Sequence, residues 1–284
     1  MRKIFSYSLF EPKLLPQHRY WDKWKSNKYR YWFNIPTIIS LNEIIYPDYE
    51  TTFFVSKNIW NNRLSEILTI FDNLNIQTID RDYSLTEPAI WRMMPMWDRE
   101  VSVLHTRDLD SLPTINEYKF IKYFESSSCS VGTIRSHENH HGIACRMLAG
   151  LSSFKPNLIT PNIKGFNFDM YYTNSENSYG SDQKLMIKTF ASNEKFTKDY
   201  FLDCKIDNQN NEQNFPCHRS SINLVETPEK IINLFDSIKK ETNVSWLGQP
   251  CDSRGYLLKL ILQQTTGYYD KIKQNKYIKE FYKV

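Results

Sequence analysis

The stretch VSVLHTRDLDS, residues 101–111, decides how we interpret the rest of the chain. Its first part, Val101 to Thr106, is mostly apolar and predicts a short buried strand. Asp108 and Asp110 follow at once, so both carboxylates stand at the mouth of this strand. Hard divalent cations take oxygen ligands, and Mg²⁺ commonly shares its coordination shell with substrate phosphates. The pattern therefore predicts a site for a cation and a diphosphate; the alternative is a polar turn before a helix that opens with a capping box at 114–117.

Strands and helices are predicted to alternate around this stretch. Strand patterns occur at 3–9, 51–55, 76–79, 101–106, 130–134 and 200–206, and helix patterns at 34–46, 64–71, 88–96, 114–124, 182–190 and 227–238. The stretch from Gly150 to Gly180 is poor in regular signals, and we interpret it as a loop over the site. This alternation predicts an α/β domain with a mainly parallel sheet, which places Asp108 and Asp110 at the edge where such sheets bind ligands.

Composition and charge exclude several classes of protein. The formal net charge is +4 over 284 residues and the basic residues are dispersed, which argues against a nucleic-acid partner. The five cysteines form no C-x-x-C pair, which is typical of a reducing compartment. We find no apolar segment long enough for a transmembrane helix and no signal-peptide pattern. We therefore expect a soluble, cytoplasmic protein.

Several segments, taken in chain order, resemble those of a family of GT-A-fold glycosyltransferase-like proteins found in viruses, bacteria and protists. The similar segments are IFSYSLF (4–10), IWRMMPMWDREVSVLHTRDLDSLPTINEYKFIKYF (90–124), GTIRSHENHH (132–141), MLAGLSSFK (147–155), SDQKL (181–185), PCHRS (216–220) and WLGQPCD (246–252). The resemblance implies a GT-A-like (Rossmann-like), mixed but mainly parallel central sheet flanked by helices. It also implies a single domain at 1–284, with a nucleotide-sugar half at 1–135 and an acceptor half at 136–284.

The same resemblance implies an activity, a cofactor and a set of site residues. The activity would be a metal-dependent hexosyl or pentosyl transfer from a UDP- or GDP-sugar to a glycan or protein acceptor, with Mn²⁺ or Mg²⁺ assisting the departing diphosphate. The implied metal ligands are Asp108, Asp110 and His218, and the implied catalytic residues are Asp182 and Gln183, of which Asp182 would orient hydroxyls or act as a base. The residues implied to bind the nucleotide sugar are Ser6, Tyr7, Trp91, Arg92, Arg107, Asp108, Arg135 and His137. For Arg107 and Arg135, phosphate binding and pairing with neighbouring aspartates both fit the sequence.

Two departures from the family pattern and two alternative functions accompany this interpretation. Ser136 stands where the family has an acidic residue, and 151–153 (LSS) replaces an expected Trp-Gly at positions implied to face the sugar.

One alternative function is a zinc metallopeptidase, because His137-Glu138-x-x-His141 matches its helical motif, although Gly142 and a preceding strand disfavour a helix there. The other is a nucleotide- or sugar-binding protein without turnover.

Overall fold

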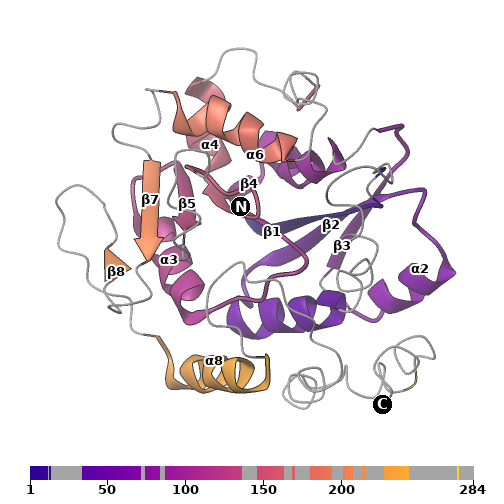
Figure 1. The fold of residues 1–284 in the computed structure, drawn as a ribbon, viewed down its shortest axis with the longest axis horizontal. Helices are drawn as coiled ribbons and strands as arrows, with labels where there is room; N and C mark the ends of the chain where they lie inside the picture. The colour runs from indigo at the N-terminus through magenta and orange to yellow at the C-terminus, as the bar shows by residue number, and fades with distance from the viewer. Residues whose placement is uncertain are drawn as a thin grey trace.

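The computed structural model describes residues 1–11, 13, 34–71, 74–83, 87–135, 146–162, 168–169, 180–193, 201–206, 213–214, 227–242 and 274. Eight strands in this part of the chain form one sheet in the order β3-β2-β1-β4-β6-β5-β7-β8 (Figure 1). Their bounds are β1 Arg2–Leu9, β2 Glu50–Ser56, β3 Leu74–Ile79, β4 Val101–Arg107, β5 Val131–Arg135, β6 Leu151–Phe154, β7 Phe201–Ile206 and β8 Gln213–Asn214. Four of the seven pairings are parallel, so the expected mixed, mainly parallel sheet is confirmed.

Helices cover both faces of the sheet, as expected. The helix at 34–45 and the helices α2 Asn62–Leu68, α3 Ile115–Ser126 and α8 Glu229–Thr242 contribute to the core on one face. The 3-10 helix η1 Glu87–Trp97, α4 Pro156–Ile159, α6 Ser181–Met186 and the π-helical turn η5 Ile187–Ala191 contribute to the core on the other. A further 3-10 turn, η4, spans Thr160–Asn162. In Figure 1, α4 and α6 lie opposite α8 across the sheet.

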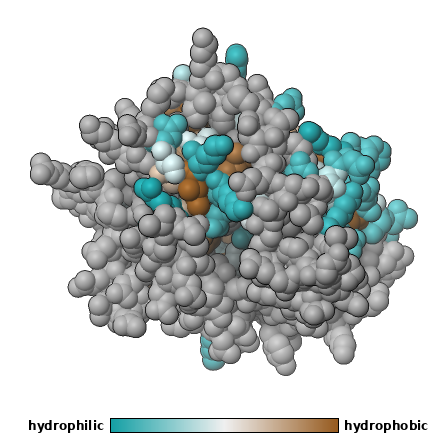
Figure 2. All heavy atoms as spheres, turned by 45° about the horizontal axis from the view of Figure 1, so that its top comes forward, coloured by the Kyte–Doolittle hydropathy of each residue, from teal (hydrophilic) through white to brown (hydrophobic). Residues whose placement is uncertain are grey.

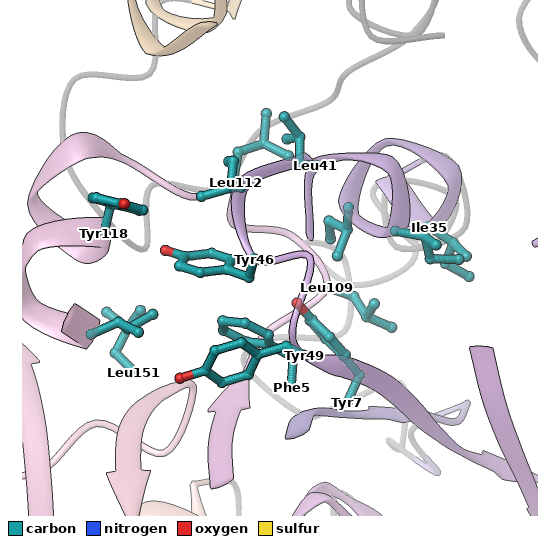
Figure 3. Close-up of a cluster of buried hydrophobic side chains, with 14 of the residues drawn as sticks. Phe5, Tyr7, Ile35, Leu41, Tyr46, Tyr49, Leu109, Leu112, Tyr118 and Leu151 are labelled. Atoms are coloured by element: carbon teal, nitrogen blue, oxygen red, sulfur yellow. The ribbon is translucent and has the colours of Figure 1, made fainter. Parts of the chain in front are cut away.

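The two cores exist because each central strand is apolar on both faces. Along β1, Phe5, Tyr7 and Leu9 belong to the first core and Ile4 to the second, which is the period-two alternation of a strand covered on both sides. In the first core, the Phe5 and Tyr46 rings lie 4.7 Å apart between centroids (Figure 3). This core also holds Leu109 and Leu112, which belong to the turn after β4, so the packing beneath that turn is continuous with the core.

Most predicted elements are confirmed, with small changes in their bounds. The predicted helix at 88–96 is a 3-10 helix, and Pro95 lies inside it. The helix after β4 begins as predicted, because the Thr114 side chain caps it by accepting the Glu117 backbone N–H at 3.3 Å. The last described strand, β8, has only two residues and was not predicted.

The expectation of an irregular stretch between Gly150 and Gly180 is wrong for its first part, residues 151–162. Residues 151–154 form β6, which lies antiparallel between β4 and β5 in the middle of the sheet, and α4 follows directly. The strand is short, and two of its four residues are serines, which lack the apolar pattern used to recognise strands. Both serines are fully buried and hydrogen-bonded, so the sheet accepts them without leaving unpaired hydroxyls.

The described surface carries little exposed apolar area. Hydrophilic side chains dominate the described part of the face that Figure 2 brings forward, and a smaller apolar area lies between them. Among the described residues, the exposed large hydrophobic side chains are Met1, Leu158 and Ile232. No described helix has the length and apolar character needed to cross a bilayer.

Candidate functional site

A buried arginine holds Asp108 at the carboxyl end of β4. Arg92, in η1, is 6% exposed, and its Nη1 donates to Asp108 Oδ1 at 2.5 Å and to the Arg107 carbonyl oxygen at 3.1 Å. The Arg92 backbone N–H donates to Ser8 Oγ at 2.9 Å, which fixes η1 against the end of β1. The Asp108 side chain remains 50% exposed. One carboxylate therefore faces solvent while a buried cation holds it in place.

The same arginine also binds Asp182, which lies 90 residues further along the chain. Arg92 Nη2 donates to Asp182 Oδ2, and Asp182 is 7% exposed in the first turn of α6. Gly180, just before α6, has φ +76, a left-handed conformation that glycine adopts without strain. Burial alone would lower the pKa of Arg92, but Asp108 and Asp182 raise the pKa above its ordinary value. The cation is therefore permanent and joins two of the residues predicted from sequence.

Gly150 leaves just enough room for the Asp108 carboxylate. A Cβ atom at this position would overlap the carboxyl carbon and both oxygens of Asp108. Asp108 immediately follows β4 and Gly150 immediately precedes β6. The pairing of Arg107 with Leu151 therefore brings Asp108 and Gly150 together. Any larger residue at this position forces Asp108 to move.

The turn from Asp108 to Ser111 is anchored to the protein interior. Leu109 is 4% exposed, and its carbonyl oxygen accepts the Asn34 side-chain amide at 3.1 Å. The Ser111 hydroxyl donates to the Asp108 carbonyl oxygen at 3.3 Å. Arg107, just before the turn, forms an ion pair with Glu117 of α3, a partner that was not among the alternatives considered from the sequence.

The chemistry of the available donors fits a hard divalent cation. Asp108 offers carboxylate oxygens at the surface, and Asp110 is half-buried two residues later in the same turn. Within the described residues, no group of three His, Cys, Asp or Glu side chains could hold a metal ion. Mg²⁺ and Mn²⁺ tolerate this, because water and phosphate oxygens complete a shell that one or two carboxylates begin.

The other predicted site residues in the described part of the chain are mostly buried. Ser6 and Trp91 are 0% exposed, Tyr7 is 3% exposed and Arg135 is 3% exposed. The Tyr7 hydroxyl accepts the Asn42 side-chain amide at 3.1 Å, and the Tyr7 ring stacks on Phe53 in the first core. Gln183 is half-buried beside Asp182. Arg135 ends β5, two strands away from β4 in the sheet.

Several predicted residues lie outside the described residues. They are His137 and His218, together with the whole motif from His137 to His141 on which the peptidase alternative depends. Ser136, where the chain departs from the family pattern, lies outside them as well.

The expectation that 151–153 faces a sugar pocket is wrong. Leu151 is 3% exposed in the first core, and Ser152 and Ser153 are 0% exposed within β6. Ser152 Oγ donates to the Leu148 carbonyl oxygen at 2.6 Å, and Ser153 Oγ lies 2.6 Å from His105 Nδ1. The departure from the family pattern therefore lies in the interior of the sheet.

Glu117, Gly150 and Ser8 contribute to this region, although sequence reasoning did not name them as site residues. Glu117 carried a signal only as part of a capping box, and Gly150 only as part of a glycine-containing turn. Ser8 had none, because a serine in an alternating strand is ordinary. Their roles come from contacts between segments that are distant in sequence.

Comparison with known proteins identifies a distant structural relative but no family. No protein-family model matches the chain, and no curated protein matches it. One similar solved structure is 4-diphosphocytidyl-2C-methyl-D-erythritol synthase from Anaerococcus prevotii, at 11% identity and a TM-score of 0.39. The match covers 84% of this chain and 96% of that one. The strand order and the helices on both faces independently define a mixed α/β, Rossmann-like fold.

Proposed function

We propose that this protein is a metal-dependent glycosyltransferase that transfers a sugar from a UDP- or GDP-sugar to a glycan or protein acceptor. The observation that carries the proposal is the cluster of Asp108, Arg92 and Asp182 at the carboxyl end of β4. Open α/β sheets bind their ligands at this edge. Asp108 faces solvent, Asp182 is buried, and Arg92 joins the two. This arrangement suits a substrate with a charged diphosphate at one end and a polyhydroxylated sugar at the other.

Asp108 and Asp110, together with His218, are the proposed ligands for Mn²⁺ or Mg²⁺. When bound, the ion would supply a Lewis acid that stabilises the departing diphosphate. Arg92 fixes Asp108 Oδ1, and the Asp108 side chain as a whole remains 50% exposed. The metal is proposed on the chemistry of these oxygen donors and on the exposure of Asp108.

Asp182 and Gln183 are the proposed catalytic pair on the sugar side. Because Arg92 occupies Asp182 Oδ2, the other oxygen is left to accept a hydroxyl group of the sugar or of the acceptor. Gln183, half-buried in the same helical turn, supplies both an amide donor and a carbonyl acceptor. Residues that fix reacting groups in this way contribute mainly through orientation.

The remaining predicted binding residues are proposed in two roles. Ser6, Tyr7 and Trp91 are buried, and they would support the binding surface at the end of β1 through packing. Arg135 and His137 are proposed to bind the donor, while Arg92 and Arg107 support the turn after β4.

Isothermal titration calorimetry with UDP, GDP and their sugars, with and without Mn²⁺, tests the proposal. We expect one nucleotide to bind in a Mn²⁺-dependent manner, and we expect Asp108→Asn or Asp110→Asn to abolish that dependence. Asp48→Asn is the matched control, since the Asp48 side chain is 51% exposed and pairs with Lys3 near the opposite edge of the sheet. If no nucleotide binds to the wild type with any metal, the proposal is wrong.

Turnover distinguishes an enzyme from a binding protein. A glycosyltransferase releases nucleoside diphosphate from its sugar donor, slowly to water and faster once an acceptor is supplied. We expect this release to require Asp182. Metal-dependent binding without release for any donor would instead identify a nucleotide-sugar-binding protein.

A further inference from the structure

The turn that carries Asp108 and Asp110 begins and ends at a buried ion pair. Arg107 ends β4, Glu117 lies in the first turn of α3, and Arg107 Nε donates to Glu117 Oε1. The two residues are ten positions apart in the chain and enclose the whole turn. Their exposed fractions are 4% and 2%, so neither side chain is available to a ligand in solution.

The surroundings of the Arg107 guanidinium also direct it inward. Nη1 donates to the Thr106 carbonyl oxygen at 2.7 Å and to the Ser152 carbonyl oxygen at 3.4 Å, and the guanidinium carbon lies 5.5 Å from the centre of the Phe5 ring. These contacts connect β4 to β6, to β1 and, through Glu117, to α3. A buried charge requires a partner and further hydrogen bonds. Nε and Nη1 of Arg107 make them, whereas Nη2 is buried without a partner among the described residues.

Glu117 forms an ion pair with Arg107 through its side chain. It is fully buried, and burial raises its pKa while Arg107 opposes that rise. Its backbone N–H donates to the Thr114 side chain, while its carboxylate accepts the hydrogen bond from Arg107. The pair therefore acts as a clamp that sets the distance between the end of β4 and the start of α3.

We propose that Arg107 and Glu117 are positioning residues that fix the turn after β4 so that Asp108 and Asp110 both face the metal and the donor diphosphate. This inference rests on the proposed function. It gives Arg107 a role through the turn, without direct contact to phosphate. Leu109 and Leu112 hold the middle of the turn in the core, and the clamp holds its two ends.

The Glu117→Gln variant tests the clamp, with Mn²⁺ as the probe. An arginine that has lost its carboxylate partner pairs with the next one available, and Asp108 is adjacent in sequence. We expect Mn²⁺ affinity, measured by electron paramagnetic resonance in the presence of UDP or GDP, to fall by about 10- to 100-fold, as is usual when partners of metal ligands are removed. The spectrum of bound Mn²⁺ should also change, whereas a loss of stability alone would leave it unaltered.

Glu125→Gln is the matched control. Glu125 lies at the other end of α3 and is a partly buried carboxylate that accepts a hydrogen bond from Tyr49 and forms an ion pair with Lys3. The same chemical change in the same helix should leave Mn²⁺ affinity within about two-fold of the wild type, since it touches no ligand or ligand partner. Affinities are compared at a temperature at which thermal unfolding shows both variants to be folded.

A double variant covers the case in which Glu117→Gln does not fold. Arg107→Gln combined with Glu117→Gln leaves no buried charge alone and should therefore fold. We expect it to lose Mn²⁺ affinity as well, because the ends of the turn are no longer clamped. Wild-type affinity in either folded variant would overturn the positioning role and leave the proposed function intact, whereas a wild type that binds no Mn²⁺ would overturn both.

Discussion

His105 should make the protein less stable in acid, and the structure allows the size of the effect to be worked out. His105 lies on β4 and is 0% exposed. Burial holds its pKa well below the ordinary value of 6.5, and the positive charges of Arg107, Lys122 and Lys3 lower it further. The folded protein therefore keeps this ring neutral in mild acid.

The hydrogen bonds of His105 fit the neutral ring. The Tyr49 hydroxyl donates to Glu125, so its oxygen can accept the Nε2–H of His105 at 3.3 Å. The Ser153 hydroxyl then donates to Nδ1 at 2.6 Å. We assign this tautomer because it satisfies both ring nitrogens, whereas a proton on Nδ1 would leave Nε2 without a donor, since the Tyr49 hydroxyl already donates to Glu125.

The linkage between protonation and folding sets the magnitude. As the pH falls through 6.5, the unfolded chain takes up a proton that the folded chain does not, so stability is lost towards acid. For one histidine that stays neutral when folded, the free energy of unfolding drops by about 2 kcal/mol between pH 8 and pH 5. Urea unfolding across this range measures the difference directly.

The His105→Gln variant should lose this part of the pH dependence. It keeps a hydrogen-bonding side chain but cannot titrate, so its curve of stability against pH should be flatter than that of the wild type by about 2 kcal/mol. Ser153→Ala is the control, because it removes the hydrogen bond to Nδ1 and keeps the titrating ring. An unchanged pH dependence in His105→Gln would refute the reasoning.

Three further variants test other contacts. Arg92→Met leaves Asp182 buried without its cation, and we expect unfolding by urea at pH 7 to show a loss of about 3–5 kcal/mol. Gly150→Ala displaces the Asp108 carboxylate, which should reduce Mn²⁺-dependent nucleotide affinity by about ten-fold in calorimetry while destabilising the fold by only about 1 kcal/mol. Asn61→Ala removes the cap that accepts the Leu64 N–H at 3.0 Å, and should cost about 1 kcal/mol in thermal or urea unfolding with nucleotide binding unchanged.

The sequence was a good guide to elements whose side chains carry a local pattern. The strands ending at Leu9, Ile79 and Arg107 were found, within a residue or two, from their apolar and β-branched residues. The short strand β6 was missed because its serines carry no such pattern and because its place is set by β4 and β5. The formation of β6 depends on its pairing with strands distant in sequence, which a short stretch of sequence does not reveal.

The candidate site was found as a set of residues, but its connections were not. Asp108, Asp182 and Arg92 were all named from sequence, whereas the double ion pair that unites them spans 90 residues and leaves no local signal. Glu117 was considered only as a capping residue, since a buried partner for Arg107 becomes visible only when β4 and α3 pack together. Residue types indicate which chemistry is available, whereas the fold determines which residues come into contact.

The position of β6 also has a consequence for the order in which the sheet assembles during synthesis. Among the described strands, β6 is the one that connects β5, β7 and β8 to the first four strands, and it is made after β5. At about 5–20 residues per second, the ribosome takes roughly one to four seconds to extend the chain from the end of β5 to the end of β6. β5 therefore leaves the ribosome that long before β6 does, with apolar side chains and no neighbouring strand, and it is then open to pairing with another chain. A pause in translation after β5 has emerged and before β6 emerges should therefore promote aggregation more than a pause of the same length after β6 has emerged.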